Sequence, residues 1–360
     1  MREIFKTKNQ DLKLPIFFPD ATQGVIKGLD SNDIRNTKTE GVLVNTYHLY
    51  RKLGKGVLNK FGGVGEFMNW EGGLISDSGG FQLMSLVKKT GKGRVRERGI
   101  EFISQSGKVL FTPEESISFQ MEIGADMLVV LDDFTPPKAD YNEAKKTVER
   151  TIRWAKRSKD EFEKICDKKG LSDKERPYLL GVVQGGEFLD LRKDCANRLE
   201  EIGFDGFGFG GWPVKESGDF HWEVAECLAE NTPEDYFLYG LGIGMPDDIV
   251  GCVDLGYNIF DCVLPTRDGR HGRIYRYKAG SMEEIKLEGD FYEFLQVGKE
   301  RQVDMTEPVS RVCDCVLCEN YSLGYLAHLF RINEMTAGRL ASIHNLRFYS
   351  ILMEKLKDRQ

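Results

Sequence analysis

Eight short apolar segments, each followed by a helical pattern or a loop, constrain the fold of this chain more than any other feature. They span residues 14–18, 42–44, 74–76, 127–131, 178–183, 206–209, 236–240 and 258–260. Strands that are apolar along their whole length are typical of a parallel sheet covered by helices on both faces. Eight strand–helix units favour an α/β fold with a closed (β/α)8 TIM barrel over a doubly wound open sheet.

Helix signals between the segments agree with this fold class. Thr112 and Glu115 form a capping box around Pro113, so we expect a helix that begins there and ends at Gly124. Residues 143–165 carry apolar side chains on one side and mainly Lys and Glu on the other. This pattern predicts a long helix on the outside of the fold.

The long gap between the third and fourth segments predicts an insertion. Residues 99–104 and 108–111 flank the turn-forming residues 105–107, and this arrangement predicts a β-hairpin. Residues 88–98, just before it, hold six basic residues and one acid. We therefore expect a hairpin insertion that is preceded by a basic segment.

Length and composition allow a barrel and a smaller second unit. The chain has 360 residues, of which 41% are hydrophobic and 30% are charged. Because the pattern changes near residue 280, we expect a barrel domain over residues 1–280 and a zinc-binding helical subdomain over residues 281–360 packed on it. No stretch approaches the roughly 18–20 apolar residues that cross a bilayer, and residues 1–12 contain no secretory signal. We expect a cytoplasmic protein with no membrane partner.

Residues 258–273 combine an acid within a strand and a basic turn. Asp261 interrupts an apolar segment that Pro265 ends, and a carboxylate in a strand is costly to bury unless it is paired or needed. The basic residues that follow are Arg267, Arg270, Arg273, Arg276 and Lys278, against the single acid Asp268. The net charge is −7, but a local basic run can still dock phosphates because salt screens charges beyond about 10 Å. Asp261 is thus either a structural residue beside a solvated turn or part of a site for a polyanionic substrate.

Polar residues stand at the ends of several predicted strands. They are Asn45, Asp77, Asp132, Gln184 and Asp261, with Gly-rich turns at Gly79-Gly80, Gly185-Gly186 and Gly210-Gly211. A (β/α)8 barrel has its active site at the carboxyl ends of its strands. One Asp at such a position often only caps a helix, but five polar strand ends in one chain indicate a site. The glycines would let backbone amides approach a flat ligand.

Two carboxylates in one site can divide the work of a displacement. One attacks as a nucleophile while the other gives and takes protons. Such a pair suits attack on a sugar C1′ through an oxocarbenium-like transition state, after which water or another base captures the ribosyl intermediate. The sequence contains no Ser-His-Asp arrangement, Walker loop or dinucleotide fingerprint.

Three of the eight cysteines are crowded in the C-terminal part of the chain. They are Cys313, Cys315 and Cys318, in a Cys-x-Cys-x2-Cys pattern, and His344 follows them. His344 lies on a predicted helical stretch over residues 321–349, with His328 as a competing ligand. Three thiolates and one imidazole make a closed tetrahedral shell for Zn2+, which favours one structural zinc ion over a catalytic one. An iron–sulfur cluster is the weaker alternative.

Four motifs together resemble those of the tRNA-guanine transglycosylases, or queuine tRNA-ribosyltransferases. The motifs are Asp77-Ser78-Gly79-Gly80-Phe81-Gln82, Asn45-Thr46-Tyr47-His48-Leu49, Phe260-Asp261-Cys262-Val263-Leu264-Pro265-Thr266-Arg267 and the Cys-x-Cys-x2-Cys…His pattern. The resemblance runs from about residue 12 to residue 350. The combination is highly specific, although any one motif would not be.

The resemblance implies a (β/α)8 barrel with a zinc subdomain. It implies exchange of the wobble guanine of GUN-anticodon tRNAs for a 7-deazaguanine, either the pre-queuosine base or queuine. Asp261 would be the nucleophile that forms a covalent ribosyl-enzyme, and Asp77 the general acid/base. The residues implied for binding of the base are Ser78, Gly79, Gly80, Phe81, Asp132, Gln184, Gly211 and Leu241, with Phe81 and Leu241 on the two faces of the ring.

The resemblance also implies tRNA contacts, a metal site and an assembly. The implied tRNA-contacting residues are Gly242, Ile243, Gly244, Met245, Pro246, Asp247, Asp248, Thr266, Arg267, Asp268, Gly269 and Arg270. The implied zinc ligands are Cys313, Cys315, Cys318 and His344. The expected partners are the anticodon loop of tRNA, the 7-deazaguanine base and a second copy of the chain in a homodimer. The wobble base would leave its stack to reach Asp261.

Three aromatic residues depart from the pattern usual in the family. Members that use the aminomethyl base commonly have Tyr at the position of Phe81, whereas queuine-using relatives have Phe there. Phe134 and Trp212 are bulky and would lie near the 7-substituent, so both incoming bases stay open. The chain ends at Gln360 without the extra RNA-binding domains of archaeal members, which favours the bacterial-like type.

Two other hypotheses compete with a base-exchange enzyme. The chain could be a non-catalytic tRNA-binding partner subunit of a transglycosylase, although it retains both Asp77 and Asp261. It could also be a zinc-dependent barrel hydrolase, which would require an open metal site beside the acids.

Overall fold

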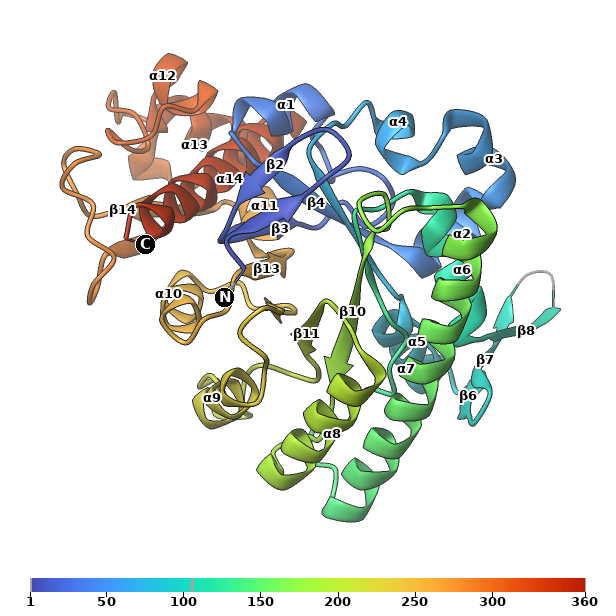
Figure 1. The fold of residues 1–360 in the computed structure, drawn as a ribbon. Coiled ribbons are helices and arrows are strands. Elements are labelled where there is room, and N and C mark those ends of the chain that lie inside the picture. The colour runs from blue at the N-terminus through green and yellow to red at the C-terminus, as the bar shows by residue number, and fades with distance from the viewer. Residues whose placement is uncertain (1, 105–106, 360) are drawn as a thin grey trace.

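A computed structural model describes residues 2–104 and 107–359 and contains an eight-stranded parallel barrel (Figure 1). Its strands are β3 (Ile16–Pro19), β4 (Gly41–Asn45), β5 (Gly73–Asp77), β9 (Met127–Val129), β10 (Tyr178–Val183), β11 (Gly206–Phe209), β12 (Phe237–Gly240) and β13 (Ile259–Cys262). They pair in chain order around one sheet, and each overlaps one of the eight predicted segments. The predicted α/β class with a (β/α)8 barrel is therefore confirmed.

The first and last strands of the barrel close the sheet. β13 pairs with β3 in a register that sets Asp261 opposite Phe18. Beyond β3, Asp20 forms a parallel bridge with Leu43 of β4, and the Ala21 N–H donates to the Leu43 carbonyl at 2.7 Å. These contacts distinguish a closed barrel from the open sheet that was the alternative.

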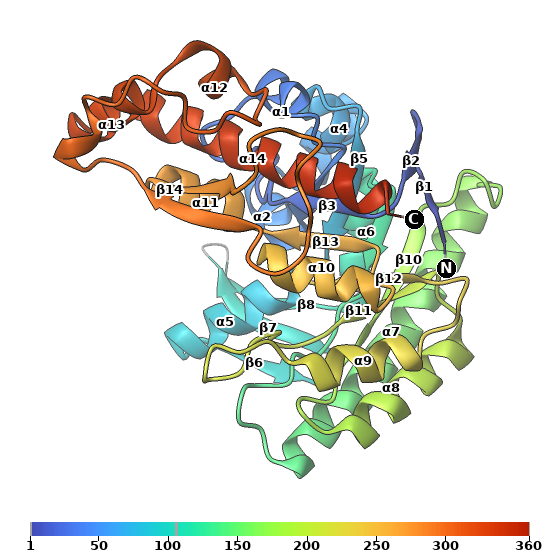
Figure 2. The ribbon, with the colours of Figure 1, turned by 90° about the vertical axis from the view of Figure 1, so that its left-hand side faces the viewer.

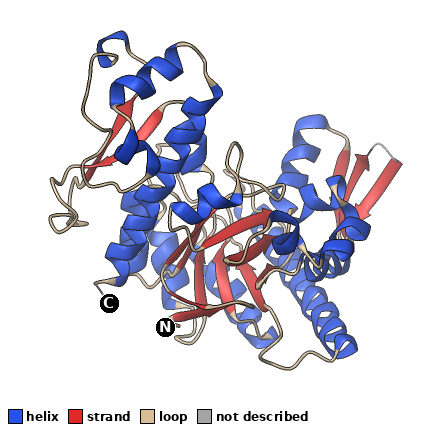
Figure 3. Cartoon of the chain, turned by 90° about the horizontal axis from the view of Figure 1, so that it is seen from above, coloured by secondary structure: helices blue, strands red, loops and turns tan. Residues whose placement is uncertain are grey.

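Helices surround the strands, as Figure 3 shows with helices in blue. In the barrel they are α1 (Ser31–Asn36), α2 (Thr46–Lys52), α3 (Gly54–Phe61), α4 (Val64–Met68), α5 (Gly80–Thr90), α6 (Pro113–Ile123), α7 (Tyr141–Lys169), α8 (Leu189–Ile202), α9 (Trp222–Glu230), α10 (Pro246–Asp254) and α11 (Leu264–Arg270). The Thr112 capping box opens α6, and Gly124, in the left-handed region at φ 73°, ends it as predicted. The helix predicted over residues 143–165 is α7, which starts earlier because the Asp140 side chain caps it.

The interior of the barrel is apolar except at its carboxyl end. A short hairpin of β1 (Ile4–Lys6) and β2 (Asp11–Lys13) contributes Phe5 and Leu12 to this interior cluster. The inward side chains of the barrel strands belong to the same buried cluster, which includes Leu43, Ile75 and Ile259. The polar residues that follow them along the strands are thereby carried to one end of the barrel.

The insertion between β5 and β9 has three strands, so the predicted two-stranded hairpin was incomplete. Its strands are β6 (Gly93–Arg96), β7 (Gly99–Ser104) and β8 (Gly107–Phe111). The missed strand β6 lies within residues 88–98, for which the sequence predicted a basic segment but no strand. Arg94 and Arg96 face solvent, while Val95 packs against a hydrophobic cluster. Residues 105 and 106 of the predicted turn lie outside the described residues.

The C-terminal part contains a strand pair and four helical elements (Figure 2). They are β14 (Arg273–Tyr277), β15 (Tyr292–Gln296), the 3-10 helix η1 (Glu300–Gln302), α12 (Val316–Asn320), α13 (Leu323–Arg331) and α14 (Met335–Lys357). The single helical stretch predicted over residues 321–349 was wrong. Asn333 takes a left-handed conformation at φ 56°, and the Glu334 side chain caps a new helix, so the stretch is divided into α13 and α14.

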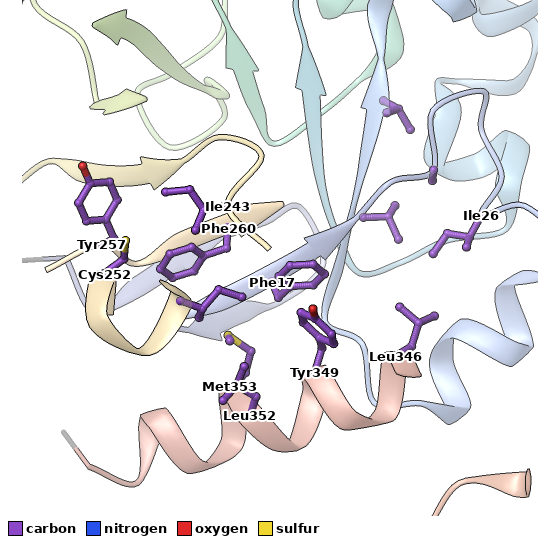
Figure 4. Packing of buried hydrophobic residues seen from close by; sticks show 14 of the residues in the cluster. Phe17, Ile26, Ile243, Cys252, Tyr257, Phe260, Leu346, Tyr349, Leu352 and Met353 are labelled. Atoms are coloured by element: carbon purple, nitrogen blue, oxygen red, sulfur yellow. The ribbon is translucent and has the colours of Figure 1, made fainter. Parts of the chain in front are cut away.

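Helix α14 packs along the barrel beside β3, as Figure 4 shows, and it also contacts α11. The rings of Tyr349 and Phe17 lie 4.6 Å apart, and Leu346 and Met353 belong to the same buried cluster. A Cβ on Gly269 of α11 would lie 2.8 Å from the backbone of Ser342, so glycine allows the two helices to approach closely. Because this cluster continues from the barrel into the C-terminal helices, the division at residue 280 stays a prediction. Among the described residues, no helix is long and apolar enough to span a membrane.

Candidate active site

The carboxyl end of the barrel gathers polar side chains from several strands. Along a strand, every second side chain points the same way. Asn45, Asp77, Gln184 and Asp261 each lie two residues beyond an apolar side chain of the barrel interior, namely Leu43, Ile75, Val182 and Ile259. The strand register thus directs four of the five predicted polar strand ends into one layer above the apolar core.

Asp77 is the best-anchored acid of this layer. Its Oδ2 accepts a hydrogen bond from Nδ2 of Asn45 at 2.7 Å, and the N–H groups of Ser78 and Gly79 also donate to it. Burial and the facing Asp261 raise the pKa of Asp77 to about 6, although these hydrogen bonds lower it. Asp77 is therefore a carboxyl that can exchange its proton near neutral pH.

The turn after Asp77 depends on glycine. Gly79 has φ 81°, and a Cβ there would lie 2.5 Å from the Cβ of Tyr47. Only glycine fits this left-handed conformation against Tyr47, and the turn leads directly into α5. Ser78 is buried, and its hydroxyl accepts from the Gly80 N–H at 3.2 Å. Ser78, Gly79 and Gly80 thus hold the backbone beside Asp77.

Asp261 lies on β13 and is buried. Its Oδ1 accepts from the N–H of Gly242 at 3.0 Å, and the buried Tyr239 side chain of β12 interacts with it. Burial raises the pKa of Asp261, while the Gly242 N–H and the Tyr239 hydroxyl lower it. Asp261 also interacts electrostatically with Asp77, so the two acids occupy one site. This position is inconsistent with a solvated structural Asp.

Asp132 and Gln184 form a second polar pair. Nε2 of Gln184 donates to Oδ2 of Asp132 at 2.6 Å, and Oε1 of Gln184 accepts from the Thr135 N–H at 3.0 Å. Burial, with smaller contributions from Asp77 and Asp133, raises the pKa of Asp132 to about 7 against the Gln184 hydrogen bond.

Gly210 and Gly211 lie next to this pair. A Cβ on Gly210 would lie 2.7 Å from Nε2 of Gln184, so the backbone approaches the amide closely. Gly211 follows at φ 99°, a conformation that favours glycine. Leu241 lies across β11, where its Cδ1 would come within 2.7 Å of a Cβ on Gly208.

Three aromatic residues cluster at the mouth of the site. The ring of Phe81 lies 5.0 Å from that of Phe134, edge to face, and 6.0 Å from that of Trp212. Phe81 is 40% exposed and Trp212 is 51% exposed. This cluster offers exposed ring faces on which a planar base could stack.

A cavity of about 510 Å3 opens beside Gly211 and Trp212. Its lining includes Thr135, whose N–H donates to Gln184, and Gly186, which follows Gln184 by two residues. In its lining Lys138 and Glu216 form an ion pair at 2.6 Å, His221 lies 3.6 Å from Glu187, and Arg192 and Lys215 are two further cations.

The predicted tRNA-contacting residues differ in exposure. The exposed ones are Gly242, Asp247 and Arg267; Met245, Asp248 and Arg270 are half-buried; Ile243, Gly244, Pro246, Thr266, Asp268 and Gly269 are buried. Asp268 accepts from the Tyr275 hydroxyl at 2.8 Å, and Asp247 accepts from that of Tyr292 at 3.1 Å. The buried members therefore shape the segments that carry the exposed ones.

The prediction of a basic turn was wrong, because Arg267 and Arg270 lie on α11 and Arg273 and Arg276 on β14. Arg276 pairs with Glu293 and Lys278 with Asp290, so neither is a free cation. Asp268 lies 3.7 Å from Arg267 and 3.8 Å from Arg273. Nη1 of Arg270 is buried without a hydrogen-bond partner among the described residues. Burial and the neighbouring Arg267 lower the pKa of Arg270.

Four potential metal ligands converge in the C-terminal part. The ligand atoms of Cys313, Cys315, Cys318 and His344 all lie within 4.8 Å of one another. Nδ1 of His344 lies 3.2 Å from the Cys318 sulfur, and its Nε2 lies 2.8 Å from the Tyr275 carbonyl oxygen, which fixes the ring. His344 and not His328 joins the three thiols. The cluster could hold a metal ion, and within the described residues no second group of this kind was found.

Sequence reasoning missed three residues at the carboxyl end, the half-buried Asp20 and the buried Tyr239 and Arg192. Asp20 and Tyr239 face Asp261 from the neighbouring strands β3 and β12. Arg192 donates to the carbonyl oxygens of Val183 at 2.7 Å and Gly186 at 2.9 Å, and so holds the turn after Gln184. A signal for Asp20 was present, since it lies two residues beyond the inward-facing Phe18.

A protein-family model decides the relationship that the motifs suggested. The model described as queuine tRNA-ribosyltransferase matches residues 2–359. The chain belongs to the queuine tRNA-ribosyltransferase family. This result confirms the predicted family and the prediction that the chain is an enzyme of that type.

Curated relatives in this family match almost the whole chain. The queuine tRNA-ribosyltransferase of Thermoanaerobacter sp. (strain X514) is 37% identical over 358 residues, which cover 99% of this chain and 88% of the relative. That of Shewanella sp. (strain W3-18-1) is 37% identical over 351 residues, covering 96% and 86%. That of Vibrio parahaemolyticus serotype O3:K6 is 38% identical over 349 residues, also covering 96% and 86%.

The raised pKa of Asp132 predicts a pH-dependent gain in stability for Asp132→Asn. With a pKa of about 7 in the folded protein and about 4 in the unfolded chain, Asp132 keeps its proton on folding, so deprotonation destabilises the fold as pH rises through this range. The free energy of unfolding of the variant should exceed that of the wild type by about 1–4 kcal/mol at pH 8, and the difference should shrink toward pH 4. Urea unfolding at several pH values measures this.

Asp173→Asn is the matched control, because the Asp173 side chain is fully exposed. It should leave the free energy of unfolding unchanged at every pH. An Asp132→Asn effect that is the same at pH 4 and pH 8 would contradict the assigned protonation state.

Proposed function

We propose that this family member exchanges the wobble guanine of GUN-anticodon tRNAs for a 7-deazaguanine base by double displacement. The observation that carries the proposal is the pair of carboxyls formed by the half-buried Asp77 and the buried Asp261, which interact at the carboxyl end of the barrel. Two carboxyls at one ribose can act on its C1′, one as the nucleophile and the other as the proton carrier.

In the first displacement, the Asp261 carboxylate attacks C1′ of the wobble nucleotide. The glycosidic bond breaks, its electron pair goes to guanine, and Asp77 donates a proton to the leaving base. The ribose is then esterified to Asp261. The Gly242 N–H orients the attacking carboxylate, and a pKa of about 6 keeps part of the Asp77 population protonated near neutral pH.

In the second displacement, the 7-deazaguanine replaces guanine in the same pocket. Asp77, now a carboxylate, accepts the proton of the ring nitrogen that attacks C1′. The ester bond breaks and Asp261 leaves as a carboxylate. One proton is given and one is taken, so the enzyme returns to its starting state.

The Asp132–Gln184 pair would bind the polar edge of the base. Asp132 and Gln184 hydrogen-bond each other at 2.6 Å, and an incoming guanine edge offers donors and an acceptor in place of that bond. The close backbone at Gly211 would add a contact, and Phe81 and Leu241 would lie on the two faces of the ring. The base would thereby regain the stacking that it lost on leaving the anticodon loop.

The arginines of α11 and β14 would bind the tRNA backbone. The side chain of Arg267 is 52% exposed and that of Arg273 is 43% exposed. Phosphate oxygens would pair with these guanidinium groups, and such contacts position the RNA without reading its sequence. The buried residues of the two predicted tRNA segments would act by shaping the loops.

The cavity beside Gly211 would receive the 7-substituent of the incoming base. Its volume of about 510 Å3 exceeds what an aminomethyl group fills, and the polar side chains of Lys215, Glu216 and Ser217 in its lining offer partners to the hydroxyl groups of a larger substituent. We therefore propose queuine over the aminomethyl base.

The four-ligand cluster fits one structural Zn2+. Three thiols and the Nδ1 of His344 form a complete tetrahedral donor set, and the Tyr275 carbonyl fixes the second ring nitrogen. Bound zinc would join residues 313–318, which lead into α12, to α14 and supply no step of the reaction.

The two competing hypotheses have less support. A non-catalytic partner subunit would have no need for two acids in one site, and a zinc-dependent hydrolase would need an open metal position. The ligand set of the cluster is closed and contains none of the site acids. The homodimer and the cytoplasmic location stay predictions.

Substitution of the nucleophile tests the proposed function. Asp261→Asn should lower the incorporation of labelled guanine into a GUN-anticodon tRNA by roughly a thousandfold or more, because an amide cannot form the ribosyl ester. Asp126→Asn, at a carboxyl bonded to the backbone at the opposite end of the barrel, should retain activity. Full exchange by Asp261→Asn would refute the assignment, and exchange by the purified wild-type chain alone would exclude the non-catalytic subunit.

A competition assay tests the incoming base. With guanine-bearing tRNA, the wild type should favour queuine over the aminomethyl base by about tenfold or more in kcat/KM, because the larger substituent fills the cavity. Unsubstituted 7-deazaguanine serves as the reference base. Preference for the aminomethyl base would contradict the role given to the cavity.

Metal content tests the cluster. Cys318→Ser should reduce bound zinc from about one ion per chain to near zero by elemental analysis, and lower the thermal unfolding midpoint. Cys227→Ser, at a half-buried thiol outside the cluster, should keep the zinc. One tightly bound zinc per chain in Cys318→Ser would refute the ligand assignment.

A further inference from the structure

A fourth carboxyl, Asp20, lies at the carboxyl end of the barrel and has no part in the double displacement. Asp20 follows β3 directly, and its backbone bridges to Leu43 of β4. Phe18, two residues earlier, is fully buried in the barrel interior, so the strand alternation points Asp20 inward in the next layer. This is the layer of Asp77 and Asp261.

The groups that face Asp20 are themselves acids or weak acids. Asp261 on β13 and Asp77 on β5 interact with it electrostatically. Its negative charge also contributes to the raised pKa of Tyr239 on β12 and of Cys262 on β13. Burial first, and then Asp261 and Asp77, raise the pKa of Asp20 far above its usual range. Asp20 therefore carries a proton near neutral pH and can both donate and accept a hydrogen bond.

The strand order gives Asp20 a definite place relative to the substrate. Around the barrel, β3 lies diametrically opposite β10, with three strands between them on either side. Gln184, at the end of β10, belongs to the pair that would bind the edge of the base. A line from Asp20 on the β3 side to Gln184 on the β10 side divides the barrel into two halves. Asp261 on β13 lies in one half and Asp77 on β5 in the other. A nucleotide with its base at Gln184 and its C1′ between the two acids extends its ribose toward Asp20.

We propose that Asp20 binds the 2′-hydroxyl of the ribose whose glycosidic bond is exchanged, so that the enzyme selects a ribonucleotide at this position. C2′ is bonded to C1′, and its hydroxyl is the ribose hydroxyl nearest to the reacting carbon. No direct hydrogen bond joins Asp20 to either catalytic acid among the described contacts, which leaves its carboxyl available to a substrate. The 2′-hydroxyl is the group by which a protein distinguishes RNA from DNA.

The inference rests on the proposed function, and one experiment separates the two. The substrates are two anticodon stem–loop RNAs with a GUN anticodon, identical except that the wobble guanosine is ribo in one and 2′-deoxy in the other. The measurement is kcat/KM for labelled-guanine exchange, and the readout is the ratio of the ribo to the 2′-deoxy substrate. This ratio does not depend on the fraction of folded enzyme.

The wild type should favour the ribo substrate by about 3- to 10-fold, the range expected for one neutral hydrogen bond. Asp20→Ala should reduce the ratio to near one, chiefly by losing activity on the ribo substrate. Asp20→Asn, whose amide still donates and accepts, should keep most of the preference. Asp126→Asn, at a half-buried carboxyl at the opposite end of the barrel, should keep the wild-type ratio.

Two results would overturn the role of Asp20: an Asp20→Ala ratio equal to that of the wild type, or a wild type with no preference. Absence of exchange on both substrates by the wild type would instead refute the proposed function, and the inference with it.

Discussion

The structure depends on holding several half-buried or buried carboxyls at one end of a closed barrel, where they form no ion pair with a cation among the described residues. Asp20, Asp77, Asp132 and Asp261 are held there mainly among one another, and burial raises the pKa of each. Burial of an unpaired charge is costly, so the site depends on neutral donors and on retained protons. The donors are the amides of Asn45 and Gln184 and the backbone N–H groups of Gly79 and Gly242. A reaction that passes a proton back and forth and forms and breaks an ester requires such a set of near-neutral acids.

The rest of the chain holds this end of the barrel in shape. Helix α14 links three features: Tyr349 packs on Phe17 of β3, Ser342 meets Gly269 of α11, and His344 belongs to the Cys3His cluster. The Tyr349 hydroxyl also donates to the carbonyl of Gly244, in the loop after β12. A metal ion bound at the cluster would therefore stabilise, through α14, the loop after β12 and helix α11, which carry the predicted tRNA contacts.

Much of this arrangement could be predicted from the sequence, and the misses have physical causes. The strands are continuously apolar because helices cover both faces, and the polar ends are visible because they break that pattern. Strand β6 was missed because it is short and has a single apolar side chain, Val95, between the exposed Arg94 and Arg96. One apolar residue is too few to show the alternating pattern of a strand. The break between α13 and α14 depends on one left-handed residue, Asn333. Asp20 was overlooked because no motif contains it, and only the register of β3 against β13 shows which way it points. The cavity beside Gly211 is formed by loops that are distant in sequence, and no local pattern reports it.

The central claim is that Asp261 forms a covalent bond to the ribose while Asp77 moves the proton. Wild-type enzyme incubated with a GUN-anticodon stem–loop RNA and no incoming base, then denatured and digested, tests it by mass spectrometry. The account predicts an RNA adduct that lacks the wobble guanine and is attached to the peptide that contains Asp261, with no such adduct in Asp261→Asn. An adduct on the peptide that contains Asp77, or an unchanged adduct in Asp261→Asn, would contradict it.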